Sequence, residues 1–113
     1  MFSPSSRVRV YVCREAVDMR KSFAGLTGLV RGVLERDPLS GHAFLFLNRS
    51  RNYVKVLWWD ETGYCIHAKR LAQGTFSSLS SGEIDMQTLF QLLSCVELKS
   101  VKSRAKYKFI REK

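Results

Sequence analysis

The chain has 113 residues, 45% of them hydrophobic, and its 19 Lys and Arg against 10 Asp and Glu give a formal net charge of +9. That length fits one domain with a sufficient core, so disulfides and structural metals are not needed for stability, and the three scattered cysteines indicate reduced thiols in a cytoplasmic protein. The apolar runs are too short to span a membrane or to form an export signal, whereas the excess positive charge indicates an anionic partner.

The first predicted elements are a strand and a helix. Arg7 to Cys13 alternates apolar and polar side chains with the two-residue period of a half-buried strand. Asp18 then offers an N-cap to a helix of about 25 Å, which ends at Asp37-Pro38. Its apolar residues recur at three- and four-residue steps: Met19, Phe23, Leu26, Val30, Val33 and Leu34. Three glycines inside it, Gly25, Gly28 and Gly32, each weaken a helix by about 1 kcal/mol relative to Ala. We therefore expect a close approach there to a sheet or to a partner.

The middle of the chain predicts an antiparallel meander. Its strand-like runs are Ala43 to Leu47, Tyr53 to Trp59 and Tyr64 to Arg70. The connections are short, and the second, Asp60 to Gly63, ends in a glycine that suits a hairpin turn. The expected fold class is α+β, a single domain with an antiparallel sheet of four or five strands and two helices.

The last third predicts a loop, a second helix and a basic tail. Residues 73 to 82 are rich in Ser and Gly and predict irregular structure, and Asp85 predicts the cap of a short amphipathic helix. From Val101 to Phe109 apolar and basic residues alternate again, as in a strand. Within the single domain of residues 1–113 we thus expect an α+β core over 1–96 and a basic strand or tail over 97–113.

Basic residues suggest contacts with nucleic-acid phosphates. In a strand, side chains on one face lie about 6.6 Å apart, which suits a phosphate backbone. The candidates are Lys102, Arg104, Lys106 and Lys108 in the tail, with Arg49, Arg51, Lys55, Lys69 and Arg70 near the hairpins. Lysines on an edge strand also discourage aggregation, and a polybasic segment also suits a membrane surface, so these two readings of the tail stay open. Arg20 and Lys21 lie at the expected helix start. They indicate an anion-binding site there, and the alternative is that they are ordinary solvated surface charges.

Trp58 and Trp59 are adjacent on an expected strand, so their side chains face opposite sides of the sheet. We expect a helix to cover the second face. The alternative is that one of these side chains stacks on a base or forms a partner surface.

Catalytic and metal sites receive little support. Asp18, Asp37, Asp60 and Glu61 are the carboxylates that a metal-dependent nuclease would need, but the first is an expected cap and the next two lie at turns. Cys65 and His67 are two ligands short of a closed zinc site. We predict no catalytic residue, metal or cofactor.

Several strings resemble one known family. They are Asp18 to Leu26 (DMRKSFAGL), Asp37 to Phe44 (DPLSGHAF), Val54 to Cys65 (VKVLWWDETGYC), and Lys69-Arg70-Leu71 followed by Gly74-x-Phe76. In this order they resemble TnpB, the second-reading-frame accessory protein of bacterial insertion sequences of the IS-sixty-six type. The resemblance implies a protein encoded by a mobile genetic element and needed beside a separate, larger transposase.

The sequence thus predicts a non-catalytic DNA-binding or transposase-assisting protein in transposition. Its expected partners are DNA and the transposase, with no membrane partner, and a homo-oligomer is compatible with the sequence. Two alternatives stay open: a protein-interaction module that uses the Trp58/Trp59 surface and the glycine-bearing helix, and a metal-dependent nuclease in which Asp18, Asp37 and Asp60 converge.

Overall fold

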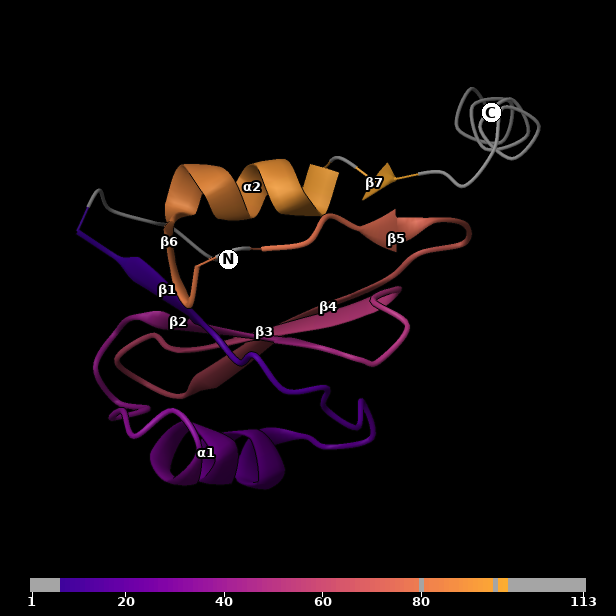
Figure 1. The fold of residues 1–113 in the computed structure, drawn as a ribbon. Helices are drawn as coiled ribbons and strands as arrows, with labels where there is room; N and C mark the ends of the chain where they lie inside the picture. Colours follow the sequence, from indigo (N-terminus) through magenta and orange to yellow (C-terminus); the bar gives the residue numbers. More distant parts are fainter. Residues whose placement is uncertain (1–6, 80, 95, 98–113) are drawn as a thin grey trace.

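A computed structural model describes residues 7–79, 81–94 and 96–97, and shows one sheet with a helix on each face (Figure 1). The sheet lies between α1 and α2, and a separate pair of short strands follows along the edge of the α2 layer. The elements are β1 (Arg9–Val12), α1 (Phe23–Gly32), β2 (Ala43–Leu47), β3 (Tyr53–Trp59), β4 (Tyr64–Arg70), β5 (Thr75–Phe76), β6 (Glu83–Asp85), α2 (Met86–Ser94) and β7 (Val96–Glu97).

The five-stranded sheet has the order β4-β3-β2-β1-β6. β2, β3 and β4 form the expected meander, with Phe44 opposite Leu57 and Val56 opposite His67. β1 pairs in parallel with β2 and antiparallel with β6. The α+β class and the five strands are confirmed. The parallel pair departs from an all-antiparallel sheet because the connection from β1 to β2 passes through α1, a crossover long enough to bring the second strand back in the same direction.

The two faces of the sheet carry separate hydrophobic cores. On the α2 face, Val10, Leu45, Val56 and Trp58 pack with Leu89 and other apolar residues of α2. On the α1 face, Phe44, Phe46 and Leu57 pack with Leu26 and Val30 of α1. The near-continuous apolar run of β2 follows from this arrangement, because its residues are buried on both faces.

α1 begins later than the sequence predicts. Its N-cap is Ser22, and the helix has 10 residues, about 15 Å at 1.5 Å per residue. The predicted cap, Asp18, instead closes a turn in front of the helix: its Oδ1 accepts the backbone N–H of Arg20 at 2.9 Å, and its carbonyl accepts that of Lys21 at 3.1 Å. This local turn competes with helix formation, as Asp side chains commonly do, so the prediction for Asp18 was wrong.

The expected close approach of the helix glycines to the sheet was also wrong. A Cβ at Gly25 would lie 3.1 Å from the Cβ of Lys21, in the same part of the chain, and a Cβ at Gly28 or Gly32 would meet nothing within 4 Å. Gly28 and Gly32 are exposed. The glycine-bearing stripe of α1 therefore faces away from the sheet.

The segment expected to be irregular contains β5, whose Phe76 is fully buried and pairs with Val96 of β7. β6 was not predicted, because three residues are too few to show an alternating pattern. The predicted cap of α2 is confirmed: the Asp85 Oδ1 accepts the backbone N–H of Thr88 at 2.8 Å.

β7 spans the expected boundary between core and tail. The tail candidates Lys102, Arg104, Lys106 and Lys108 lie outside the described residues. Within the described part of the chain, neither helix is long and apolar enough to traverse a lipid bilayer.

Candidate nucleic-acid interface

One end of the sheet gathers positive charge. β1 and β2 both end there, β3 begins there and β4 ends there. The segment after β1 is fastened to it by the Val17 N–H, which donates to the Leu47 carbonyl at 2.9 Å. We call this region the basic end; its charged residues are Arg14, Arg20, Lys21, Arg49, Arg51, Lys55, Lys69 and Arg70, with Glu15, Asp18 and Glu83. The Glu83 carboxylate pairs with Arg9.

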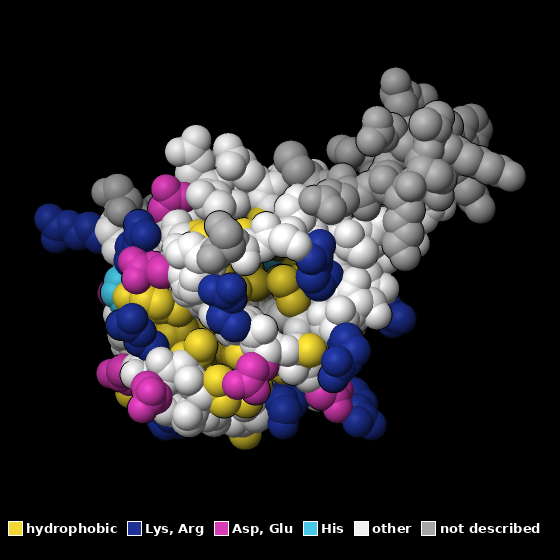
Figure 2. Space-filling view, in the orientation of Figure 1, with side chains coloured by type: hydrophobic (Ala, Val, Ile, Leu, Met, Phe, Trp, Pro, Cys, Tyr) yellow, Lys and Arg dark blue, Asp and Glu magenta, His cyan; other side chains and the backbone are white. Residues whose placement is uncertain are grey.

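The opposite end of the sheet is more acidic. It comprises the last turn of α1, the segment before β2, the β3–β4 turn and the start of β1. Its charged residues are Arg7, Arg9, Arg31, Arg36, Glu35, Asp37, Asp60, Glu61 and Asp85. In Figure 2, Lys and Arg predominate toward the right, where the basic end lies, and Asp and Glu are more frequent on the left. The charge of the described residues is thus polarised along the strands.

On the α1 face, three of the predicted cations lie close together. Lys55 and Arg70 face the same side, since they stand opposite Ala68 and Tyr53 in the β3–β4 pair. The Lys55 Nζ donates to the Lys21 carbonyl oxygen at 2.8 Å, which brings β3 to the segment before α1. The Arg70 guanidinium lies 5.7 Å from the centre of the Tyr53 ring. Lys21, Lys55 and Arg70 therefore form one positive surface beside the N-terminus of α1.

Lys69 belongs to the other face. Its Nζ donates to the carbonyl oxygen of Leu93 at 2.5 Å, in the last turn of α2. A lysine at that position satisfies a helix carbonyl that has no partner within the helix. Lys69 is thus engaged in fastening α2 to β4 and lies apart from the Lys21, Lys55 and Arg70 surface.

The β2–β3 loop holds Arg49 and Arg51 in different roles. The loop is closed by Asn48, whose Oδ1 accepts the N–H groups of Asn52 at 3.0 Å and Tyr53 at 3.1 Å. Arg51 adopts a left-handed backbone, φ 56°, and its guanidinium donates to the Phe76 carbonyl at 2.7 Å and to the Ser78 hydroxyl. Arg49 is exposed, and no hydrogen bond or ion pair with another described residue occupies it.

Arg20 is already paired. Its guanidinium contacts both carboxylate oxygens of Asp18, the shortest distance being 2.7 Å from Nη2 to Oδ2. These hydrogen bonds lower the pKa of Asp18 from its ordinary value of 3.8 to about 2. Because α1 starts only at Phe23, Arg20 and Lys21 precede the helix rather than occupy its first turn. Of the two, Lys21 keeps its ammonium available on the positive surface.

The two tryptophans separate as predicted. Trp58 is 9% exposed and packs in the core beneath α2, whereas Trp59 is half-buried on the α1 face, with its ring centre 5.1 Å from that of Tyr64. The expectation that helices cover both faces is therefore confirmed. A helix over its face leaves Trp58 little ring surface to offer to a base.

The carboxylates proposed for a nuclease are used in separate turns. The Asp37 Oδ1 accepts the Leu39 N–H at 2.9 Å, and the Asp60 Oδ1 accepts the Gly63 N–H at 3.2 Å. Within residues 7–79, 81–94 and 96–97, no three His, Cys, Asp or Glu side chains are grouped as a metal site would require. Cys65 and His67 share one face of β4.

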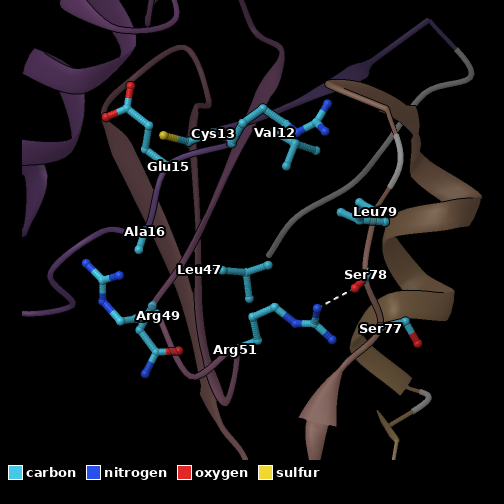
Figure 3. A pocket seen from close by; sticks show the side chains of 12 residues that line it. Val12, Cys13, Glu15, Ala16, Leu47, Arg49, Arg51, Ser77, Ser78 and Leu79 are labelled. Atoms are coloured by element: carbon cyan, nitrogen blue, oxygen red, sulfur yellow. Dashed lines mark hydrogen bonds between the residues drawn. The ribbon is translucent and has the colours of Figure 1, made fainter.

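Sequence reasoning did not single out Arg14. It follows β1, and only the parallel pairing of β1 with β2 places it beside the β2–β3 loop. Arg14, Arg49 and Arg51 line one pocket of about 230 Å³ (Figure 3). Its position, outside the carboxyl ends of adjacent parallel strands, is where open sheets commonly bind ligands.

Comparison with known proteins finds the same family that the sequence strings resemble. The family model described as IS66 Orf2 like protein matches residues 8–103. Among curated proteins, the chain is 40% identical over 76 residues to the uncharacterized protein y4hO of Sinorhizobium fredii, and 33% identical over 76 residues to y4jC of the same organism. These matches cover 67% of this chain, and 66% and 65% of the two relatives. No solved structure matches the chain significantly.

Proposed function

Because the chain belongs to the IS66 Orf2-like family of insertion-sequence proteins, we propose that it is an accessory protein of transposition that binds nucleic-acid phosphates through its basic end. In this proposal it acts by binding rather than by catalysis, and assists a separate transposase. The observation that carries the proposal is the polarisation of charge: eight Lys and Arg side chains lie with three carboxylates, Glu15, Asp18 and Glu83, at one end of the sheet.

The arrangement suits a phosphate backbone. Lys21, Lys55 and Arg70 present positive charge from two strands and the segment before α1, on elements fixed by hydrogen bonds and by the core beneath them. Contacts of this kind neutralise phosphates, release counterions and position a protein on DNA without reading its sequence. The tail cations Lys102, Arg104, Lys106 and Lys108 add to this contact in the proposal. Specificity for element ends would then come from the transposase.

The test is DNA binding by the purified full chain, measured by fluorescence anisotropy over a range of salt concentrations. The double variant Lys21→Gln/Arg70→Gln removes two exposed charges of the basic end. We expect it to weaken binding and to reduce the slope of log K against log salt by about 2, since each phosphate contact contributes about 0.9.

The matched control is Arg7→Gln/Arg31→Gln, which removes two exposed charges from the opposite end. It should leave the salt slope almost unchanged. A variant with Lys102, Arg104, Lys106 and Lys108 changed to Gln measures the contribution of the tail in the same assay. Equal losses from the two double variants would show that net charge alone matters and would overturn the role of the basic end.

A second candidate function, docking on the transposase, is favoured by an apolar pocket of about 380 Å³ between α2 and β4. Phe90, which lines it, is 46% exposed, and β4 lies at the edge of the sheet formed by the described residues. An edge strand beside an apolar pocket suits an added strand from a partner. Transposase binding that persists at salt concentrations abolishing DNA binding, and that Phe90→Ser removes, would favour this function over the first.

A further inference from the structure

The pocket outside β1 and β2 is a distinct feature of the basic end. Three segments build it: residues 12–16 after β1, residues 47–51 at the end of β2 and in the following loop, and residues 77–79 after β5 (Figure 3). Since β1 and β2 are parallel, their carboxyl ends open on the same edge of the sheet, and the chain then leaves toward α1 in one case and toward β3 in the other. Residues 14–16 lie between two hydrogen bonds that hold the segment after β1 on β2, from Cys13 N–H to the Leu45 carbonyl and from Val17 N–H to the Leu47 carbonyl, each at 2.9 Å, and the pocket opens beside them.

The lining of the pocket is cationic. It includes Arg14, Arg49 and Arg51, and the hydroxyl groups of Ser77 and Ser78, against the one carboxylate of Glu15. In Figure 3 the Glu15 carboxylate points away from the guanidinium groups of Arg49 and Arg51. Cys13 also lines the pocket, and burial raises the pKa of its thiol, so it adds no negative charge near neutral pH. The pocket therefore favours an anion.

The three arginines differ in how they are held. Arg51 fixes the wall, because its guanidinium bonds to the Phe76 carbonyl and the Ser78 hydroxyl. Arg14 and Arg49 are exposed, and neither forms a hydrogen bond or ion pair with another residue in the described part of the chain. Two arginines thus have guanidinium groups available to a ligand, and in Figure 3 that of Arg49 points away from the fixed guanidinium of Arg51.

Size narrows the class of ligand. The volume of about 230 Å³ is below the roughly 300–1,000 Å³ of pockets for drug-sized ligands. A phosphate with the sugar attached to it fits such a space, whereas a base-paired duplex does not. A terminal phosphomonoester carries up to two negative charges near neutral pH and offers three acceptor oxygens, which suits the forked donors of arginine.

We propose that this pocket binds the terminal phosphomonoester of a nucleic-acid strand, with Arg14 and Arg49 as its ligands. The inference rests on the proposed function, since the strand reaches the pocket across the basic end. It adds a preference that duplex phosphodiesters alone would not give: recognition of a phosphorylated strand end.

The test compares labelled DNA strands of one sequence that end in phosphate or in hydroxyl, at the 5′ and at the 3′ end, with the full-length protein. We expect the phosphorylated end to bind about tenfold more tightly, as a charge-assisted contact implies. The preference should shrink between about pH 7.5 and pH 5.5, because the phosphomonoester takes up a proton near pH 6. Arg14→Gln and Arg49→Gln should each reduce the preference, and the double variant should abolish it.

Arg70→Gln is the control, because it lies in the basic end and outside the pocket lining. It should weaken both DNAs equally and keep the preference. Thermal unfolding of each variant separates loss of binding from loss of folding. Inorganic phosphate and a nucleoside monophosphate, tested as competitors, distinguish a strand end from a free phosphomonoester.

The outcomes separate the two proposals. Equal binding of phosphorylated and hydroxyl ends, with salt-dependent DNA binding intact, would overturn the pocket assignment and leave the proposed function standing. Binding of the free nucleotide without any DNA binding would overturn the proposed function and the strand-end assignment together.

Discussion

Arg51 and Phe76 bind each other twice: the Arg51 guanidinium donates to the Phe76 carbonyl at 2.7 Å, and the Phe76 N–H donates to the Arg51 carbonyl at 2.8 Å. The two residues are 25 positions apart in the chain. Phe76 is fully buried, so this pair anchors the β2–β3 loop to the core beneath α2. Arg51 thus supplies one of the three positive charges of the pocket and also holds its wall in place.

Replacing Arg51 should therefore destabilise the fold. Arg51→Ala removes both guanidinium contacts, and a hydrogen bond to a charged group contributes about 1.5–3 kcal/mol, so we expect the free energy of unfolding to fall by about 2 kcal/mol. Arg51→Gly loses the same contacts but relieves the left-handed backbone, φ 56°, and should cost about 1 kcal/mol less. Urea unfolding of both variants checks this. Two variants as stable as the parent chain would show that Arg51 carries no structural role.

A glycine at position 35 should stabilise the protein. Glu35 has φ 53° directly after the last turn of α1, where the N–H of Arg36 reaches back to the Val30 carbonyl at 3.0 Å. Glu35→Gly relieves this backbone and should raise the free energy of unfolding by about 1 kcal/mol. Glu35→Gln makes the same charge change without the relief and should stay within about 0.5 kcal/mol of the parent. Equal free energies of unfolding for Glu35→Gly and Glu35→Gln would exclude backbone strain at this position.

The Asp18–Arg20 pair predicts a pH dependence. Hydrogen bonds from Arg20 lower the pKa of Asp18 to about 2 in the folded protein, against 3.8 ordinarily. The ionised carboxylate therefore stabilises the folded state above pH 3.8, and this contribution is lost as the pH falls from 3.8 through about 2. Carboxyl carbon shifts in an NMR titration measure the pKa directly. Arg20→Ala should move it up toward 3.8, and Arg31→Ala should not; titration of the parent near 3.8 would contradict the pairing.

The Cys65 thiol should be alkylated slowly, and a substitution at Asp60 should remove part of the cause. Partial burial, and then a hydrogen bond to the Asp60 carboxylate at 3.3 Å, raise the pKa of its thiol. Asp60→Asn removes the negative charge, so the thiolate forms at lower pH and alkylation near pH 8 should become faster. Peptide mass spectrometry follows Cys65 separately, with Cys13, which is buried, as the internal reference. If Cys65 in the Asp60→Asn variant is alkylated at the same rate as in the parent, while Cys13 stays slow, Asp60 is not the cause of the slow reaction of Cys65.

The sequence predicts a strand best where its side chains either alternate between apolar and polar or are apolar throughout. β2, β3 and β4 match their expected ranges because alternation or continuous apolar character runs over five or seven residues. β6 has three residues and escapes this signal. The start of α1 was misplaced because Asp18 suits a turn as well as a helix cap, and only the observed hydrogen bonds to Arg20 and Lys21 decide between them.

The candidate site was less accessible to sequence reasoning. Lys55 and Arg70 could be assigned to neighbouring strands, but their proximity to Lys21 depends on where α1 begins. Arg14 carried no local signal, because it comes to line one pocket with Arg49 only through a parallel pair that a meander-like pattern does not reveal. Arg51 and Lys69 look like surface cations in the sequence, and tertiary contacts engage them with carbonyl groups.

The place of β1 in the sheet has a consequence for biosynthesis. β1 is made before the other described strands, yet it pairs on one side with β6, and Arg9 contacts Glu83, 74 positions later. Until that segment emerges, the nascent sheet keeps an open hydrophobic strand edge, and long-range pairing of this kind folds slowly. A chain that stops before residue 83 would therefore lose more than its last elements, because its first strand would be left with one neighbour and a free edge available to other chains.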